Sequence, residues 1–223
     1  MAAPVLKPMQ GSAGNGVYGR KVLAVVLAAG CARRFGRPKQ LACLDGVSLV
    51  RRAADAALAS CAGETCVVVG AYADVVSREL DGMPVLVAEN EAWQQGQSST
   101  LHCAVRTAQV QGREGILFLP VDMPFVDARH LNALLEVSAG NEFRVAASLG
   151  EDGAMAPCVL PSAYFPELLA LQGDKGAVSL IRRLEGEGKV ALVPFRDSCM
   201  AFDVDTPDDL EEAGQIARGD MKL

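Results

Sequence analysis

An apolar run that leads directly into a short loop of small and cationic residues constrains this chain more than any other feature. Residues 22–27 are all aliphatic, and residues 28–39 then read Ala-Ala-Gly-Cys-Ala-Arg-Arg-Phe-Gly-Arg-Pro-Lys. Small residues let a backbone approach a ligand closely and turn its N–H groups inward, and arginine and lysine supply charge against oxyanions. In α/β proteins, phosphates bind where a strand runs into such a loop. The sequence therefore predicts a nucleoside triphosphate site in this loop.

Strand and helix patterns alternate along the rest of the chain. Strands are predicted at residues 22–28, 66–70, 85–88, 115–119, 144–148, 156–160 and 190–193, and helices at 48–60, 73–80, 98–110, 127–137, 162–171, 175–184 and 207–217. This rhythm is typical of a mostly parallel sheet with helices on both faces. We expect one Rossmann-like α/β domain over residues 21–223, preceded by a flexible tail over residues 1–20. Ligands of such sheets bind beyond the carboxyl ends of strands, which favours the loops at 29–39, 89–99 and 120–126.

Composition narrows the classes of partner. The chain has 223 residues, half of them hydrophobic, and a formal net charge of −6. An acidic protein does not attract polyanions, so neither nucleic acid nor an anionic membrane is expected as the main partner. The seven cysteines contain no C-x-x-C pair and only two histidines accompany them, which indicates neither a disulfide framework nor a zinc site and suits the reducing cytoplasm. No apolar run is long enough to predict a membrane-spanning helix.

A carboxylate at the end of an apolar strand is the second chemical signal. Asp122 follows residues 115–119 and lies between Pro120 and Pro124, which restrict its backbone. A rigid carboxylate at a strand end suits Mg²⁺, which prefers a few carboxylates together with phosphate oxygens. A helix N-cap is the alternative role, but Asp127 fits that role better.

A second acidic segment opens the last predicted helix. Thr206 is expected to cap this helix, which leaves Asp203 and Asp205 without a local role. In a strand these two side chains would point to opposite faces, so only one of them could join Asp122 at a metal ion. Two carboxylates from distant segments on one metal ion suit transfer at a phosphorus atom.

Two further segments have open roles. In the polar segment 90–100, hydroxyl groups and helix N-terminal amides can bind a base edge or a phosphate, but Ser98 or Ser99 equally serves as an N-cap. Trp93, the only tryptophan, suits either a core anchor or a base-stacking platform. Residues 150–176 either shape a second substrate pocket or simply link strands and helices.

Several motifs together resemble the MobA-like nucleotidyltransferases, from about Val22 to Ala217. They are Leu27-Ala-Ala-Gly-x-x-x-Arg34-Phe-Gly36-x-x-Lys39, Trp93-x-x-Gly96-x-Ser98-Ser99, Asp122-Met-Pro, Gly173-Asp-Lys-Gly176 and Asp205-Thr-Pro-x-Asp-Leu210. The Ala-Ala-Gly form and the Gly-Asp-Lys-Gly segment look most like the molybdenum cofactor cytidylyltransferase branch, whereas the guanylyl branch is more typically Ala-Gly-Gly. Ala32 stands where the family often has serine, which removes one expected phosphate contact.

The resemblance implies Mg²⁺-dependent transfer of CMP from CTP to the phosphate of molybdenum cofactor, with release of pyrophosphate. It implies catalytic roles for Arg34 at the β- and γ-phosphates and Lys39 near the α-phosphate, with Asp122 and Asp205 as metal ligands. Implied nucleotide contacts are Leu27, Ala28, Ala29, Gly30, Gly36, Gly96, Ser99, Thr100 and Pro120, and implied acceptor contacts are Gly153, Pro157, Asp174, Lys175 and Gly176. A client molybdoenzyme or its chaperone is a further expected partner.

Four other functions compete with this one. A molybdenum cofactor guanylyltransferase would use GTP, and a sugar-phosphate nucleotidyltransferase would usually be longer. A nicotinamide or flavin oxidoreductase would need G-x-G-x-x-G and an acidic residue about 20 positions later, whereas this loop has only Gly30 and Gly36. A non-catalytic carrier or chaperone of molybdenum cofactor would have no need of Lys39 and Asp122.

Overall fold

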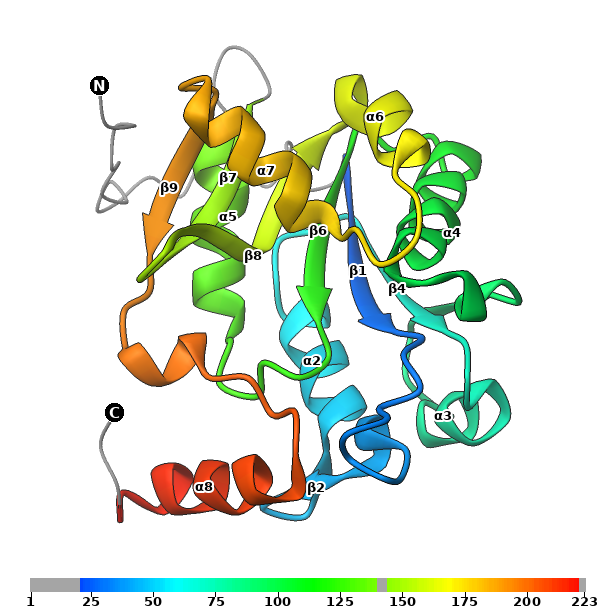
Figure 1. The fold of residues 1–223 in the computed structure, drawn as a ribbon, viewed down its shortest axis with the longest axis vertical. Coiled ribbons are helices and arrows are strands. Elements are labelled where there is room, and N and C mark those ends of the chain that lie inside the picture. Colours follow the sequence, from blue (N-terminus) through cyan, green and yellow to red (C-terminus); the bar gives the residue numbers. More distant parts are fainter. Residues whose placement is uncertain (1–20, 140–143, 221–223) are drawn as a thin grey trace.

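A large central sheet organises the molecule (Figure 1). In the computed structural model, which describes residues 21–139 and 144–220, its strands are β1 (Val22–Ala28), β4 (Glu64–Val69), β5 (Leu86–Glu89), β6 (Gly115–Pro120), β7 (Val145–Gly150), β8 (Gly153–Pro161) and β9 (Val190–Pro194). They lie in the order β5-β4-β1-β6-β8-β7-β9. β8 is antiparallel to both of its neighbours, and the other neighbouring strands are parallel. The predicted mostly parallel sheet is confirmed.

Helices cover both faces of this sheet. The helices are α2 (Leu49–Leu58), α3 (Ala73–Glu79), α4 (Gln97–Val110), α5 (Ala128–Ser138), α6 (Phe165–Ala170), α7 (Ala177–Gly186) and α8 (Pro207–Arg218). One core cluster joins the sheet to α2, α3 and α5, and the other joins it to α4, α6 and α7. α8 lies apart from both layers, below the strands in Figure 1, and contributes Ala213 to the first cluster.

Alternation along β1 explains why the sheet needs two covered faces. Ala24 and Val26 belong to the first core cluster, whereas Leu23 and Val25 belong to the second. Successive side chains of a strand point to opposite faces. An uninterrupted aliphatic run therefore requires helices on both sides, as strands buried in parallel sheets usually do.

The order of the strands opens a crevice beside β1. The chain proceeds from β1 outward through β4 to β5 and then returns to β6 on the other side of β1. The connections after β1 and β6 therefore leave in different directions. Such a reversal is where open α/β sheets bind ligands, at the carboxyl ends of the strands. The loops that follow β1 and β6 are the two that the sequence predicts to bind phosphate and metal.

Two predicted helix caps are confirmed and one is wrong. The side chains of Asp127 and Thr206 accept a backbone N–H at the start of α5 and α8, and the Ser48 side chain does the same for α2. For α4, neither predicted serine is the N-cap, because the helix begins at Gln97 and its N-cap is Gly96, which has a φ of 98°. The Ser99 hydroxyl instead donates to the Gly96 carbonyl.

Short elements account for the remaining differences. The sequence patterns do not indicate the hairpin β2–β3 (Cys43–Leu44 and Val47–Ser48) or the 3₁₀ turns η1 (Lys39–Leu41), η2 (Trp93–Gln95) and η4 (Ser198–Ala201). The predicted helix at 162–171 is divided into the turn η3 (Ser162–Tyr164) and α6. The predicted tail, residues 1–20, lies outside the described residues. Within residues 21–139 and 144–220, no helix is both long enough and apolar enough to span a membrane.

Candidate nucleotide and metal site

The loop after β1 carries backbone N–H groups that lack acceptors. Within the described part of the chain, no N–H of residues 30–34 donates to another backbone group, whereas the N–H groups of Phe35 and Gly36 donate to the Ala32 carbonyl at 3.0 and 3.3 Å. Ala32 and Gly36 adopt positive φ angles of 48° and 72°. A run of free N–H groups in a loop with left-handed residues forms a concavity that binds anions. The loop thus has the geometry predicted for a phosphate cradle.

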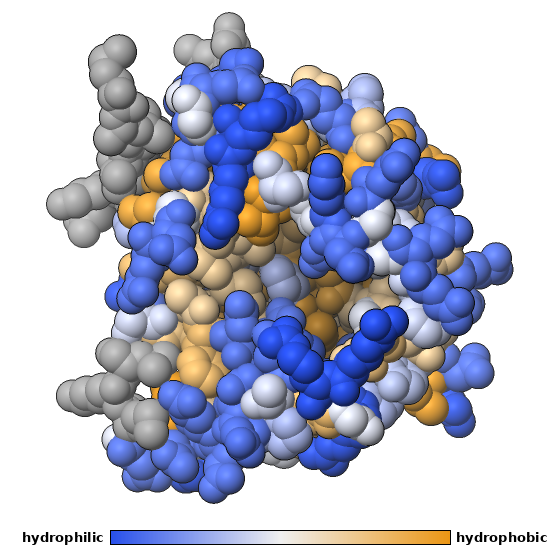
Figure 2. Space-filling view, in the orientation of Figure 1, coloured by the Kyte–Doolittle hydropathy of each residue, from blue (hydrophilic) through white to orange (hydrophobic). Residues whose placement is uncertain are grey.

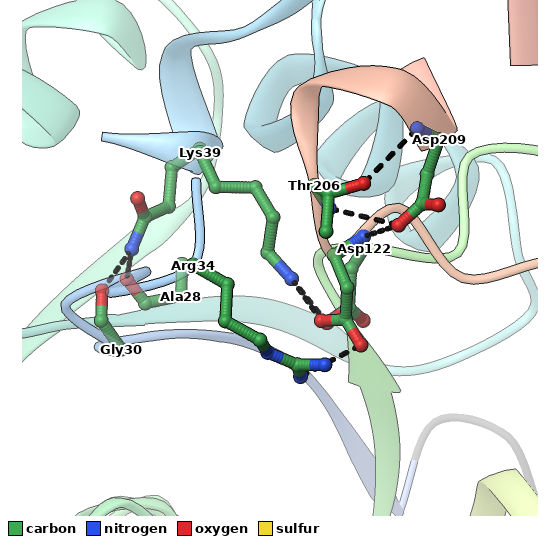
Figure 3. Close-up of polar contacts among 9 residues, drawn as sticks. Ala28, Gly30, Arg34, Lys39, Asp122, Thr206 and Asp209 are labelled. Atoms are coloured by element: carbon green, nitrogen blue, oxygen red, sulfur yellow. Dashed lines mark hydrogen bonds and ion pairs between the residues drawn. The ribbon is translucent and has the colours of Figure 1, made fainter. Parts of the chain in front are cut away.

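Lys39 joins this loop to two carboxylates from distant segments (Figure 3). Its ammonium lies 2.9 Å from Asp122 Oδ2 and 3.0 Å from Asp205 Oδ1. Arg34 Nη2 lies 2.8 Å from the other oxygen of Asp205. Burial of the Lys39 side chain, which is only 11% exposed, would lower its pKa, but the two carboxylates outweigh this and raise the pKa. The ammonium therefore stays charged, and the predicted catalytic and metal-binding residues form one cluster.

Backbone hydrogen bonds hold the second carboxylate in place. Val204 N donates to the carbonyl oxygen of Asp122 at 2.9 Å, which fastens the segment before α8 to the end of β6. The N–H groups of Asp205 and Thr206 both donate to Asp209 Oδ2 at 2.8 Å, and the Thr206 hydroxyl accepts from Asp209 N. This reciprocal cap fixes the backbone beside the Asp205 carboxylate. The position of Asp205 is thus set both by the cap of α8 and by the hydrogen bond to the end of β6.

The structure corrects one geometric expectation about the acidic segment. Residues 202–205 are irregular, not a strand, so the prediction that Asp203 and Asp205 point to opposite faces of a strand is wrong. Desolvation, followed by the negative charges of Asp122 and Asp205, raises the pKa of Asp203 to about 7, although that residue as a whole is exposed. Both carboxylates therefore lie near Asp122. Of these two carboxylates, only Asp205 contacts the Lys39 ammonium that Asp122 also contacts.

The donor set fits a metal ion that takes its remaining ligands from a substrate. Within residues 21–139 and 144–220, no three His, Cys, Asp or Glu side chains are grouped as a metal site. Asp122 and Asp205 nevertheless share one cation position, since both contact the same ammonium at hydrogen-bond distance. Mg²⁺ is typically held by one or two carboxylates, with phosphate oxygens and water completing its octahedron.

A cavity of about 590 Å³ adjoins this cluster. Figure 2 shows the corresponding hollow near the middle of the molecule, with an apolar floor and a hydrophilic rim. Of the predicted site residues, Leu27, Ala29, Gly30, Lys39, Gly96, Thr100, Pro120, Asp122 and Asp174 line it. Arg34 and Asp205 do not line it, but their ion pairs connect them to Lys39 at its edge. The cavity and the charged cluster therefore form one site.

Other predicted residues lie outside the cavity lining. Ala28 ends β1 and Gly36 belongs to the loop that follows, and Ser99 is buried, where its hydroxyl accepts a 2.8 Å hydrogen bond from Asn90 Nδ2. Gly153 and Pro157 lie on β8, whose end pairs with β6, and the lining includes neither Lys175 nor Gly176. The roles predicted for these residues stay predictions.

The two segments predicted to bind substrates, around residues 90–100 and 173–176, meet in one wall of the cavity. Ser98 N donates to the Gly173 carbonyl at 3.0 Å, which docks segment 173–176 on the start of α4. At Gly96, a Cβ would lie 2.5 Å from the Gly173 carbonyl carbon, and a Cβ at Gly176 would collide with Gln97. Glycine is needed at Gly96 because the two backbones approach so closely there, whereas the contact at Gly176 is with the end of a flexible side chain. Asp174 thereby reaches the cavity that the loop after β1 also lines.

Sequence reasoning misses several lining residues. Gln40 follows Lys39 in the motif, but nothing in the sequence shows which way its side chain points. Trp93 lines the cavity and belongs to neither core cluster, so its position favours the ligand-facing role that was left open. Cys31, Ala32, Arg33, Gln94, Gln95, Gln97, Val121 and Gly173 complete the lining. Their contribution depends on how the loops fold against one another.

Comparison with known proteins identifies the family. A family model described as the MobA-like NTP transferase domain matches residues 24–188. The chain belongs to the MobA-like NTP transferase family. The matched span of this MobA-like chain includes Lys39 and Asp122 but ends before Asp205, so the second carboxylate is contributed by residues beyond it.

Two known proteins are similar over most of the length of both chains. The purine catabolism protein PucB of Bacillus subtilis is 30% identical over 200 residues, which cover 85% of this chain and 94% of PucB. Nicotine blue oxidoreductase of Paenarthrobacter nicotinovorans is 29% identical over 192 residues, which cover 83% of this chain and 92% of that protein. The names of these relatives thus refer to different processes, so membership of the family does not by itself define a substrate.

Solved structures agree with the fold and the family. A nucleotidyl transferase from Methanothermobacter thermautotroptrophicus, Mth528, is 26% identical with a TM-score of 0.76, and the match covers 89% of this chain and 98% of that one. Rv0371c of Mycobacterium tuberculosis, solved in complex with manganese, is 27% identical with a TM-score of 0.67, over 87% of this chain and 98% of that one. This MobA-like protein is therefore a nucleotidyltransferase by family, with a structural neighbour known to bind manganese.

Proposed function

We propose that this protein is a Mg²⁺-dependent molybdenum cofactor cytidylyltransferase. The observation that carries the proposal is the Lys39 ammonium shared by Asp122 and Asp205 beside a loop of free N–H groups. A loop of free N–H groups, a positively charged side chain and two carboxylates that share one cation position are suited to transfer of a nucleotidyl unit.

The reaction exchanges one phosphoanhydride bond for another. An oxygen of the acceptor's terminal phosphate attacks the α-phosphorus of CTP, and the bond from that phosphorus to the α,β-bridging oxygen breaks. Pyrophosphate leaves with the electron pair of the broken bond. No covalent enzyme intermediate is needed, so the protein acts by positioning the two phosphates and by neutralising charge.

Each group of the site has a defined task in this reaction. The free N–H groups of residues 30–34 and the guanidinium of Arg34 bind the β- and γ-phosphates, and Lys39 offsets charge that develops at the α-phosphate. Asp122 and Asp205 hold the metal ion. When bound, Mg²⁺ neutralises phosphate oxygens and orients the triphosphate.

The acceptor is proposed from the motifs that resemble the molybdenum cofactor cytidylyltransferase branch. Segment 173–176, which places Asp174 at the cavity, supplies a second wall for it. The Ala-Ala-Gly sequence at residues 28–30 favours CTP over GTP by its resemblance to the cytidylyl branch. Delivery of the product to a client molybdoenzyme or its chaperone, in the cytoplasm, is part of the same proposal.

Pyrophosphate release tests the proposal directly. The purified protein is incubated with Mg²⁺, molybdenum cofactor and one of CTP, GTP, ATP or UTP, and a parallel series omits the cofactor or replaces it with a sugar 1-phosphate. We expect release that depends on both CTP and the cofactor. Preference for GTP would indicate the guanylyl branch, and release only with the sugar phosphate would indicate the sugar-phosphate class. Absence of release with every triphosphate would contradict nucleotidyl transfer.

One relative favours a second candidate function. By its similarity to nicotine blue oxidoreductase, the chain would in this second function bind the pyrophosphate of a nicotinamide dinucleotide in the loop after β1. Asp122 and Asp205 have no evident use in hydride transfer. Binding of NADH or NADPH, measured by fluorescence with and without Mg²⁺, separates the two functions, because only the transferase requires the metal ion for tight nucleotide binding.

A further inference from the structure

The side chain of Gln40 is hydrogen-bonded to two carbonyl groups at the end of β1 and in the loop that follows. Its amide nitrogen donates to the Ala28 carbonyl at 2.8 Å and to the Gly30 carbonyl at 2.7 Å. Figure 3 shows both carbonyl oxygens turned toward the same amide nitrogen. Gln40 is only 2% exposed, so these hydrogen bonds are shielded from water. One side chain thus fixes the direction of two peptide groups in the predicted phosphate cradle.

The direction of these carbonyls determines where the neighbouring N–H groups point. In a trans peptide, the C=O and the N–H of one plane point in opposite directions. With the Gly30 oxygen held by Gln40, the N–H of Cys31 points away from Gln40, and Cys31 lines the cavity without a backbone acceptor for that N–H. The same reasoning applies to the peptide between Ala28 and Ala29. The amide of Gln40 thereby fixes the direction of donors in this loop.

Without this hold, the peptide after Gly30 has room to rotate. A Cβ built at Gly30 would meet nothing within 4 Å, and glycine adopts both signs of φ readily. Rotation would replace the Cys31 N–H with the Gly30 oxygen on the cavity side. A carbonyl dipole aimed at a triphosphate repels it, whereas an N–H attracts it.

The side-chain oxygen of Gln40 indicates that folding stability alone does not explain why this position holds a glutamine. Oε1 of Gln40 is buried and has no hydrogen-bond partner. A buried acceptor without a donor is unfavourable. The two donors of the amide are both used on the loop, and the acceptor is left unpaired, which is the pattern expected if the carbonyl directions matter for ligand binding.

Gln40 also couples the loop to the charged cluster. It lies in the 3₁₀ turn η1, directly after Lys39, so the same short turn holds the loop carbonyls and directs the ammonium to Asp122 and Asp205. We propose that Gln40 is a positioning residue that keeps the loop after β1 in its anion-binding conformation. This inference rests on the triphosphate site of the proposed function but not on the base or the acceptor.

The test measures affinity for the Mg²⁺ complex of inorganic tripolyphosphate by isothermal titration calorimetry. This probe has no base and needs no acceptor. Gln40→Met keeps the size of the side chain and removes both donors, and Gln109→Met, on an exposed position of α4 outside the cavity, is the matched control. We expect Gln40→Met to weaken tripolyphosphate binding about tenfold or more, on the scale of two lost hydrogen bonds, while Gln109→Met binds as the wild type does. Cytidine, titrated in parallel, should bind equally to all three proteins.

A second variant gives a readout that a purely structural role would not move. Gln40→Glu restores the shape, but a carboxylate faces the two carbonyls as an acceptor and only its protonated form has a donor. Its affinity for tripolyphosphate, relative to wild type at the same pH, should therefore rise as the pH is lowered. This variant also serves if Gln40→Met does not fold.

Each result has a separate meaning. Equal binding by wild type and Gln40→Met, or equal losses for tripolyphosphate and cytidine, would overturn the positioning role and leave the proposed function intact. If wild type itself binds neither tripolyphosphate nor CTP, the triphosphate site is absent and the proposed function falls together with this inference.

Discussion

The ammonium of Lys39 lies 2.9 Å from Asp122 Oδ2 and thereby connects the turn after the first loop to the end of β6. The same nitrogen contacts Asp205 Oδ1 at 3.0 Å. A metal ion that binds to these two oxygens must take the place of the ammonium, because one position between the carboxylates cannot hold both cations. Lys39 is then free to contact the triphosphate.

Removal of this ammonium should therefore strengthen metal binding in the absence of nucleotide. In Lys39→Met, Asp122 and Asp205 keep their negative charges but lose the competing cation. We expect tighter Mn²⁺ binding than in wild type, measured by the decrease of the free Mn²⁺ signal in electron paramagnetic resonance. Pyrophosphate release should nevertheless fall by roughly 10²–10³-fold, as expected when a donor to the transition state is lost. Weaker Mn²⁺ binding by the variant would contradict this competition.

Asp122→Asn should abolish most activity while the fold is retained. The carboxamide keeps the size of the side chain but removes a charged metal ligand, and the bond from Val204 N to the Asp122 carbonyl is a backbone interaction that the change does not remove. We expect pyrophosphate release to fall roughly 10²–10³-fold, with an unchanged circular dichroism spectrum. Asp81→Asn, at an exposed position after α3, is the matched control and should retain full activity. Full activity in Asp122→Asn would remove Asp122 from the site.

The buried imidazole of His130 should make stability depend on pH. His130 is 1% exposed, stacks on Phe195 and bonds through Nε2 to the Ser148 hydroxyl, while Nδ1 has no partner. Burial lowers the pKa of His130 to about 4 from 6.5, against the attraction of Asp127 and with the repulsion of Arg196. Between these pH values the unfolded chain binds more protons than the folded one, so this contribution is complete above about pH 6.5 and declines as the pH falls toward 4.

Urea unfolding of wild type and His130→Gln at several pH values measures this effect. The free energy of unfolding of wild type should lose up to about 3 kcal/mol between pH 7 and pH 4 through this group. The glutamine variant lacks the titrating ring, so its pH profile should be flatter by that amount. Parallel profiles for the two proteins would show that His130 does not carry the dependence.

The close contact between Gly96 and Gly173 should make Gly96 intolerant of a methyl group. Gly96→Ala adds a Cβ against the Gly173 backbone at a position whose φ is already positive. Gly82 has a similar φ of 81° but open space around it, so Gly82→Ala isolates the effect of φ alone. By urea unfolding we expect roughly 1 kcal/mol of destabilisation for Gly82→Ala and distinctly more for Gly96→Ala. Only Gly96→Ala should also weaken CTP binding, and equal effects of both changes would argue against the docked wall.

Trp93 should report nucleotide binding by its own fluorescence. It is the only tryptophan of the chain and it lines the cavity. Mg²⁺–CTP should change the emission intensity with saturation at the affinity found by calorimetry, because the ligand changes the polarity around the ring. An emission spectrum that is identical with and without saturating nucleotide would place the ligand away from Trp93.

Much of the fold follows from the sequence because period-two and period-3.6 patterns report burial. The aliphatic run of β1 is buried on both faces, so its pattern alone indicates a central parallel strand. The same patterns do not reveal β2 and β3, which have two residues each, too few for any periodicity. Ser98 also looked like a cap by residue type, but the chain reverses at Gly96, whose positive φ ends η2 and starts α4.

The charged residues of the site could be predicted from the sequence, but the contacts that position them could not. Lys39 and Asp122 follow strands β1 and β6, and the rule that ligands bind at carboxyl ends of parallel strands brings them together. Asp205 could be named from its motif, but its approach to Asp122 depends on the Val204 hydrogen bond, which no local pattern encodes. Gln40 was missed because its role depends on the direction of a buried amide rather than on residue type or spacing.

The hydrogen bond from Val204 to Asp122 has a consequence for the order in which the protein becomes competent. The loop, the ammonium and the first carboxylate are translated before the second carboxylate, which belongs to the segment that leads into α8. A nascent chain that already contains β1 and β6 therefore still lacks one of the two proposed metal ligands. The charged cluster can form only once the segment around Asp205 has been made.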